Sequence, residues 1–200
     1  MKNCIIIGNA KIEILNSESK IFLEKLIKES DVIIRFNNLL NYGNEFGVKT
    51  SYLFCTNKGN PGMRYPSFKL FIKLLFNKPK SIIYSYPKEF YSHSPFVVKI
   101  LGKDYSDFIS RKLFFIKNKN FIENSIYSES LKMVNYESSK FVPSSGLIAL
   151  NFILKNFDSK IFKIYFIGFS WQGWDGHNWA FEKNYFKSLV QDGKIEEIKL

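Results

Sequence analysis

The stretch CIIIGN, at residues 4–9, places an uninterrupted apolar run directly before a glycine and an asparagine. Such runs are typical of strands in a parallel sheet that is covered on both faces, because neither side of the strand meets water. Similar short runs, each ending near turn or polar residues, recur at residues 32–34, 51–55, 81–85 and 161–167. The sequence therefore favours a mostly parallel sheet.

Segments with helical spacing lie between these runs. The apolar positions that mark them are Ile21, Leu23, Leu26 and Ile27; Phe68, Phe71, Ile72, Leu75 and Phe76; and Leu147, Leu150, Ile153 and Leu154. The alternation predicts an α/β fold: one Rossmann-like domain over residues 1–200, with helices on both faces of the sheet. Residues 87–140 are less regular, and we expect helices and loops there that cover one end of the sheet.

The composition indicates a globular chain with a basic surface. Its 200 residues are 46% hydrophobic and 18% aromatic, which excludes wholesale disorder. The formal net charge is +11, but the only arginines are Arg35, Arg64 and Arg111, and the lysines are scattered. Because side chains that read bases and phosphates are often arginines, we disfavour nucleic acid as a partner. The basic surface suits anionic substrates or a membrane face.

The cysteines and the short apolar runs bear on the compartment. Cys4 and Cys55 lie in strand-like runs, and no Cys/His cluster indicates a structural zinc site. We expect two reduced core thiols, as in a cytosolic protein. No apolar stretch approaches the roughly 18 residues that span a bilayer, and the N-terminal run is too short for a signal peptide. These features predict a soluble cytoplasmic protein that at most rests on a membrane.

Ligands of open α/β sheets bind at the carboxyl ends of strands and at helix N-termini, and two loops fit that rule. Gly8 can bring the backbone close to a ligand, and Asn9 can donate and accept hydrogen bonds; the alternative is an ordinary turn. The loop is not GxGxxG, so a nicotinamide or flavin dinucleotide is disfavoured. The second loop, PSSG at residues 143–146, begins a helix and predicts an anion site or a plain helix cap.

A third loop follows the last long apolar run. Residues 167–186, IGFSWQGWDGHNWAFEKNYF, hold all three tryptophans and one of the two histidines. We expect a helix from His177 or Asn178 to about residues 192–193. His177 is the candidate general base, because a helix N-terminus would keep its imidazole neutral; the alternative is a partly buried capping histidine. The other histidine, His93, is interpreted as a surface or packing residue.

Three further side chains of this stretch have open interpretations. Trp171 and Trp174 could stack on a sugar or base ring, or belong to the core. Glu182 lies on the same helix face as Phe186, and an inward carboxylate needs a partner. That partner could be the first turn of the helix, the backbone around His177, or another loop. We expect Glu182 to fix the geometry of the loop that carries His177.

Taken in this order, the three loops resemble the motifs of glycosyltransferase family 29, the sialyltransferases, including short bacterial members. The family's large motif is similar to residues 4–9 and 31–37 with Gly43, Gly47 and Lys49-Thr50. Its small motif is similar to residues 143–147 and 165–169. Its very short motif, a histidine followed by four residues and a glutamate, is matched by His177 and Glu182. The resemblance covers roughly half of the chain and implies a variant of the GT-A glycosyltransferase fold.

The resemblance implies an inverting transfer of sialic acid, or a related keto sugar acid, from a CMP-sugar to a hydroxyl of a bacterial surface glycan such as lipooligosaccharide or capsule. No metal or other cofactor would take part. Partners would be the CMP-sugar and a glycan or glycolipid acceptor, with peripheral contact at the inner membrane. The roles implied are donor contacts for Asn9 and Asn37, CMP binding by Ser144, Ser145 and Gly146, a place against the nucleotide for Gly168, and proton abstraction by His177.

The chain departs from the family pattern in two places. Cys4 lacks the cysteine that its family counterpart pairs with, which fits a reducing compartment. The family's third-motif histidine is absent between Gly168 and His177. Leaving-group stabilisation would then come from Trp171, Gln172, Tyr136 or a lysine. The alternative hypothesis is a non-catalytic or repurposed nucleotide-binding protein on the same scaffold.

Overall fold

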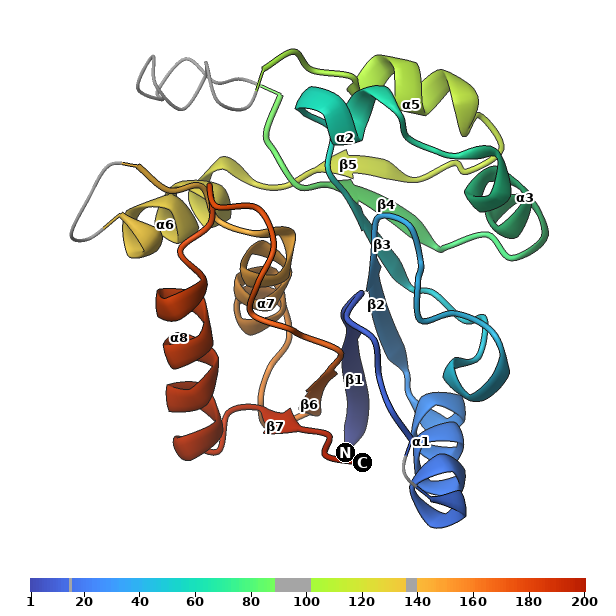
Figure 1. Cartoon of the computed structure of the whole chain (residues 1–200), viewed down its shortest axis with the longest axis vertical. Coiled ribbons are helices and arrows are strands. Elements are labelled where there is room, and N and C mark those ends of the chain that lie inside the picture. Colours follow the sequence, from blue (N-terminus) through green and yellow to red (C-terminus); the bar gives the residue numbers. More distant parts are fainter. Residues whose placement is uncertain (15, 89–101, 136–139) are drawn as a thin grey trace.

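The computed structural model describes residues 1–14, 16–88, 102–135 and 140–200, and a seven-stranded sheet forms its centre (Figure 1). The order across the sheet is β5-β4-β3-β2-β1-β6-β7, and all of these strands pair in parallel. The strands are β1 (Lys2–Ile7), β2 (Val32–Phe36), β3 (Tyr52–Cys55), β4 (Ser81–Tyr84), β5 (Lys119–Phe121), β6 (Phe162–Ile167) and β7 (Glu196–Glu197). The prediction of a parallel sheet is confirmed, and the short edge strands β5 and β7 are additions to it.

Helices cover both faces of the sheet, as predicted. They are α1 (Ser17–Glu29), the 3-10 helix η1 (Asn44–Phe46), α2 (Gly59–Met63), α3 (Phe68–Phe76), α5 (Ser106–Lys112), α6 (Asn124–Val134), α7 (Ser145–Asn156) and α8 (Trp179–Gln191). Figure 1 shows α6, α7 and α8 on one side of the sheet and α1, α3 and α5 on the other. The sequence-based expectation of an α/β, Rossmann-like architecture is confirmed.

The continuous apolar runs are explained by buried clusters on both faces of the sheet, one beneath α7 and α8 and two on the opposite face, beneath α1 and α3. Along β1, Cys4 and Ile6 belong to the core beneath α7 and α8, whereas Ile5 and Ile7 belong to the core beneath α1. Successive strand residues point to opposite faces, so each must be apolar when both faces are covered.

The order of strands sets where a ligand can enter. From β1 the chain moves through β2, β3 and β4 to β5 at one edge, and it then returns to place β6 on the other side of β1. The direction of winding therefore reverses between β1 and β6. In open α/β sheets the crevice beyond the carboxyl ends of two such strands is the usual binding site.

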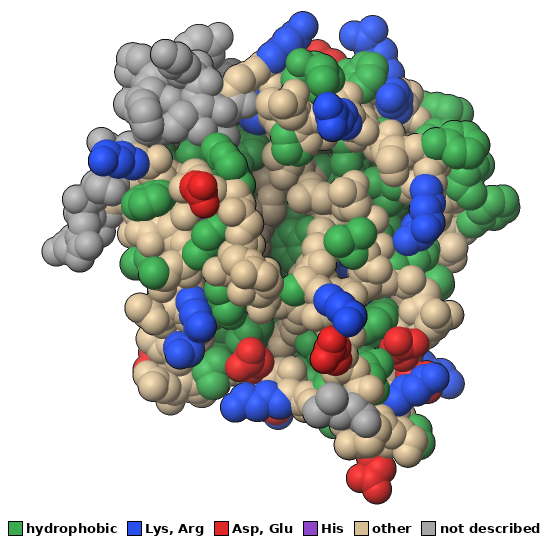
Figure 2. All heavy atoms as spheres, in the orientation of Figure 1, with side chains coloured by type: hydrophobic (Ala, Val, Ile, Leu, Met, Phe, Trp, Pro, Cys, Tyr) green, Lys and Arg blue, Asp and Glu red, His purple; other side chains and the backbone are tan. Residues whose placement is uncertain are grey.

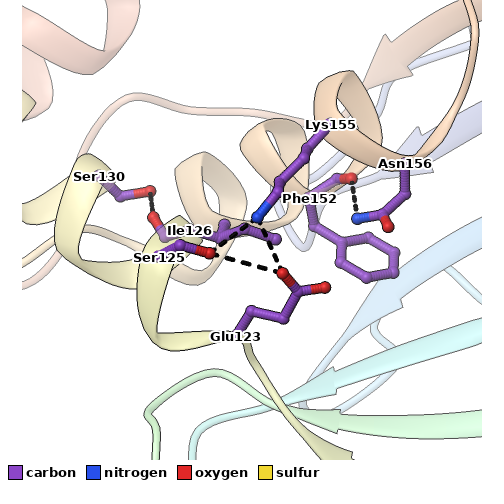
Figure 3. Close-up of polar contacts among 7 residues, drawn as sticks. All are labelled: Glu123, Ser125, Ile126, Ser130, Phe152, Lys155 and Asn156. Carbon is purple, nitrogen blue, oxygen red and sulfur yellow. Dashed lines mark hydrogen bonds and ion pairs between the residues drawn. The ribbon is translucent and has the colours of Figure 1, made fainter.

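Helices α6 and α7 pack side by side, with contacts along the second half of α7. In the buried part of the contact the Asn151 side chain donates to the hydroxyl of Ser130 at 2.8 Å. At the surface Lys155 donates to Glu123 at 2.8 Å and to Ser125 at 2.7 Å (Figure 3). The buried hydrogen bond contributes more than the exposed ion pair, because water screens the latter.

Our prediction for α3 is wrong about which face of the helix is buried. Leu70 and Leu74 enter the core at 2% and 0% exposure, whereas Phe68 and Phe76 of the predicted stripe are 81% and 78% exposed. This helix is apolar on two faces, so periodicity did not identify the face toward the sheet. Ile21 of α1 is exposed for a similar reason, since the core takes Leu23, Leu26 and Ile27.

The irregular region of the sequence both covers and widens the sheet. Its described part, residues 102–135, contains α5, β5 and α6. We predicted helices and loops at one end of the sheet, and the pairing of β5 with β4 adds a strand to that account. His93 and Tyr136 lie outside the described residues.

Candidate functional site

A cavity of about 740 Å³ opens at the carboxyl ends of the central strands. Figure 2 shows the surface hollowed near its centre, between the loop that follows β6 and the middle of the sheet. The lining combines the loops after β1, β2, β3 and β6 with the start of α7. It consists of Gly8, Asn9, Ala10, Phe36, Asn37, Thr56, Lys58, Gly59, Asn60, Pro61, Tyr86, Ser144, Ser145, Gly146, Gly168, Phe169, Ser170, Trp171, Gln172, Trp174, His177 and Trp179.

The structure brings together the nine residues to which the sequence analysis assigned catalysis or donor binding. Those lining residues are Gly8, Asn9, Asn37, Ser144, Ser145, Gly146, Gly168, Trp171 and His177. Glu182, which we assigned to structural support, lies behind this lining at 1% exposure. The segments come from four separate parts of the chain, so only the fold makes them one site.

Two glycines allow the loops after β1 and β6 to touch. A Cβ atom on Gly8 would lie 2.1 Å from the carbonyl oxygen of Gly168, which is far inside van der Waals contact. Gly168 itself has φ +78°, a conformation that favours glycine. Ala10 donates its N–H to the Gly168 carbonyl at 2.9 Å, which closes the cavity floor.

The two asparagines join neighbouring strand ends. The side chain of Asn9 donates to the carbonyl of Phe36 and accepts from the N–H of Leu40, both at 3.2 Å. Asn37 accepts the N–H of Thr56 at 2.8 Å. Both residues therefore hold the floor of the cavity in shape as well as lining it.

The second predicted loop begins α7 as expected, but it follows α6 rather than a strand. Ser144 is the N-cap, and its hydroxyl oxygen accepts the N–H of Leu147 at 3.2 Å. Ser145 and Gly146 occupy the first two helical positions, whose N–H groups the ladder within the helix does not use. Because both line the cavity, the positive end of the α7 dipole faces it.

The partner of the Glu182 carboxylate is another loop, the one that begins α7, which was one of the three alternatives. The carboxylate therefore supports the N-terminus of α7 and not the loop that carries His177, which corrects the role that we expected. One carboxylate oxygen accepts the N–H of Ser144 at 2.9 Å, and the other accepts its hydroxyl at 2.5 Å. Burial raises the pKa of Glu182 to about 7, although the two hydrogen bonds from Ser144 oppose that shift. The carboxylate is thus an internal brace between α8 and α7.

His177 is held separately and in a defined tautomer. Its Nδ1 lies 2.6 Å from the carbonyl oxygen of Val142, which can only accept, so Nδ1 carries the proton. In the neutral ring Nε2 is then an acceptor. Burial lowers the pKa of His177, partly offset by the hydrogen bond to Val142, and this shift favours the neutral ring. The N-cap of α8 is Asn178, so the alternative of a capping histidine is wrong.

The tryptophans frame the histidine and close the cavity wall. Trp174 and Trp179 each place a ring edge-on to the imidazole at 4.9 Å between centroids. Trp171 stacks on Phe169 at 5.4 Å and meets the core residue Phe186 at 4.8 Å. It therefore combines the two interpretations, since it packs on the core and also lines the cavity.

Lys58 is a candidate functional residue that the sequence analysis missed. Among the described residues that line the cavity it is the only lysine or arginine. It is 8% exposed, and its ammonium lies 3.2 Å from the carboxylate of Asp104. The signal was present, because Lys58 follows the end of β3, where the rule for strand ends places ligands.

The remaining observations concern metals, membranes and relatives. In the part of the chain that the structure describes, no three His, Cys, Asp or Glu side chains gather as a metal site. None of the described helices is long and apolar enough to cross a bilayer. No protein-family model matches the chain, and no curated protein matches it significantly.

Proposed function

We propose that the chain is a sialyltransferase-like, inverting glycosyltransferase that moves sialic acid, or a related keto sugar acid, from a CMP-sugar to a hydroxyl of a bacterial surface glycan. One observation carries the proposal. A neutral histidine with an accepting Nε2 and the open N-terminus of a twelve-residue helix border the same cavity. The first suits proton abstraction from an acceptor, and the second suits the phosphate of a donor.

The donor would lie across the sheet crevice. Its phosphate would accept from the N–H groups of Ser145 and Gly146, with Lys58 as the nearby positive charge. The bare backbone at Gly8 and Gly168 would let the nucleotide approach closely. A cavity of about 740 Å³ falls within the roughly 300–1,000 Å³ usual for small-ligand sites. Asn9, Asn37 and Trp171 would provide further donor contacts.

The transfer would then proceed in one displacement. The acceptor oxygen attacks the anomeric carbon as its proton passes to Nε2 of His177. The bond between that carbon and the phosphate oxygen breaks, and CMP leaves with the electron pair. The N-terminus of α7 and Lys58 stabilise the negative charge on the departing phosphate. They would thus replace the absent third-motif histidine in stabilising the leaving group. Trp171 and Gln172, which line the same wall, would exclude water from that bond.

Calorimetric titration with CMP in EDTA tests the donor assignment, with UMP, GMP and AMP as controls. We expect micromolar binding of CMP alone, since a metal has no role in the proposed site. A matched pair of variants locates the ligand: Lys58→Gln removes a charge at the cavity, and Lys155→Gln removes an exposed charge on α7 outside it. Binding of CMP that is weakened equally by both, or absent from the parent protein, would contradict the proposal.

A second candidate is a nucleotide-binding protein that performs no transfer. It is favoured by the absence of a histidine between Gly168 and His177 and by the pairing of Lys58 with Asp104, which reduces the charge available to a phosphate. It predicts CMP binding with neither transfer nor slow hydrolysis of any CMP-activated keto sugar acid. Release of CMP from such a donor that depends on His177 would exclude it.

A further inference from the structure

The outward face of α3 is an exposed apolar stripe. Phe68, Ile72, Leu75 and Phe76 follow the i, i+4, i+7, i+8 spacing of one helix face, opposite the buried Leu70 and Leu74. Phe68 and Phe76 are 81% and 78% exposed. Isolated exposed apolar side chains are common, but a continuous stripe marks an interaction surface.

The stripe continues onto the segment after α5. Phe71 of α3 packs edge-on against Phe115 at 5.5 Å, and Phe115 packs against Phe114 at 5.7 Å. Phe114 is 76% exposed. The docking face, as we define it, comprises the α3 stripe and Phe114. Figure 2 shows hydrophobic side chains beside lysines or arginines on the rim over α3 and α5.

The charge in the segments that carry the docking face is predominantly positive, although Asp107 lies in the first turn of α5. Residues 59–88, which include α3, contain no Asp or Glu, and they contain Arg64, Lys69, Lys73, Lys78, Lys80 and Lys88. Residues 111–122, which include Phe114, also lack acidic residues and carry Arg111, Lys112, Lys117 and Lys119. Exposed phenylalanines among lysines match a bilayer that contains anionic lipids, since the rings enter the acyl boundary while the ammonium groups meet the headgroups.

We propose that the α3 docking face binds the surface of an anionic lipid bilayer. A second copy of the chain fits this face poorly, because pairing two such faces would bring two sets of lysines together. The helix α1 offers a contrast: its Ile21 and Phe22 are 64% and 52% exposed, but Glu18, Glu24 and Glu29 balance Lys20, Lys25 and Lys28. Charge complementarity thus singles out α3. The proposal does not depend on the nucleotide site.

Co-sedimentation of the full chain with vesicles tests it, using phosphatidylcholine alone and phosphatidylcholine mixed with phosphatidylglycerol. We expect binding to the anionic vesicles that weakens with salt. The pair Phe68→Gln and Phe76→Gln should reduce that binding about tenfold, since the buried apolar area is lost. The pair Lys69→Gln and Lys78→Gln should reduce it roughly fivefold for each lysine. The matched control pair, Ile21→Gln and Phe22→Gln, should leave it unchanged.

Three results would overturn the proposal. The first is that the parent protein does not bind anionic vesicles. The second is that the phenylalanine pair on α3 and the control pair on α1 weaken vesicle binding equally. The third is that sedimentation velocity shows the parent protein as a dimer and the phenylalanine variant as a monomer. The last would make the face an interface between copies. Circular dichroism and urea denaturation of each variant verify that it is folded, and the lysine pair tests the face without altering its apolar residues.

Discussion

Helices α7 and α3 begin with the same capping signal, but their N-termini lie in different environments. Each follows a Pro-Ser pair, and in each the serine hydroxyl accepts an N–H three residues on, Leu147 at 3.2 Å in α7 and Leu70 at 3.3 Å in α3. Both helices are strongly apolar. Yet the start of α7 lies in the cavity under a buried carboxylate, whereas α3 begins with an exposed phenylalanine.

The difference shows which properties are local. A cap and an apolar composition are properties of about four to ten residues, so the sequence of each helix specifies them alone. A binding site needs groups from distant segments, and α7 receives them from Glu182, Lys58 and His177. None of these side chains lies at the start of α3, and the apolar side chains on the outward face of α3 remain exposed at the surface.

The largest expected effect tests whether the α7 side is a catalytic site. His177→Asn keeps a side-chain donor for the Val142 carbonyl but removes the base, so transfer should fall by roughly 10²–10⁴-fold. CMP affinity measured by calorimetry should change by less than about twofold, because the imidazole acts on the acceptor proton. Equal losses of transfer and CMP binding would make His177 a binding or structural residue. Ser67→Ala, at the start of α3, serves as a control that leaves transfer unchanged.

Removing the two caps compares the helices directly. Ser67→Ala should lower the free energy of unfolding by about 1 kcal/mol, the usual value of a helix cap. Ser144→Ala should lower it by roughly 2–4 kcal/mol, because the buried carboxylate of Glu182 also loses a hydroxyl donor. Urea denaturation measures both. Losses of the same size would mean that Glu182 gains little from Ser144.

A smaller effect follows from the pKa of Glu182. Because burial raises that pKa from 4.5 to about 7, the folded chain holds this proton more tightly than the unfolded chain does. The contribution of Glu182 to stability is therefore fully present below pH 4.5 and is lost as the pH rises toward 7, by at most roughly 3 kcal/mol.

The variant Glu182→Gln, whose side chain resembles the protonated acid, isolates the contribution of Glu182 ionisation to stability. The stability of the variant relative to the parent should rise between pH 4.5 and 7 and then level off, in urea denaturation at a series of pH values. Lys155→Gln, outside the cavity, should follow the parent. A constant difference between the Gln variant and the parent across this window would show that the pKa of Glu182 is not raised.

The central strands, their alternation with helices and the loops at the site can be predicted from the amino-acid sequence alone. Runs such as residues 4–7 can be buried on both faces only in a covered parallel sheet, and the end of each run marks a loop at the same edge. The bounds of α8 were also local, with Asn178 as the N-cap and Gly193 after the last turn. These features follow from backbone geometry within a few residues.

Three features emerge only in the packed fold: the partner of Glu182, the presence of Lys58 in the cavity and the buried face of α3. Each depends on a segment distant in sequence: Ser144 lies 38 residues from Glu182, and Asp104 approaches Lys58 from the start of α5. The edge strands β5 and β7 were missed because three- and two-residue strands have no apolar periodicity of their own. The hydrophobic pattern of the sequence indicates which residues are buried, but only the packed fold specifies which buried residues contact one another.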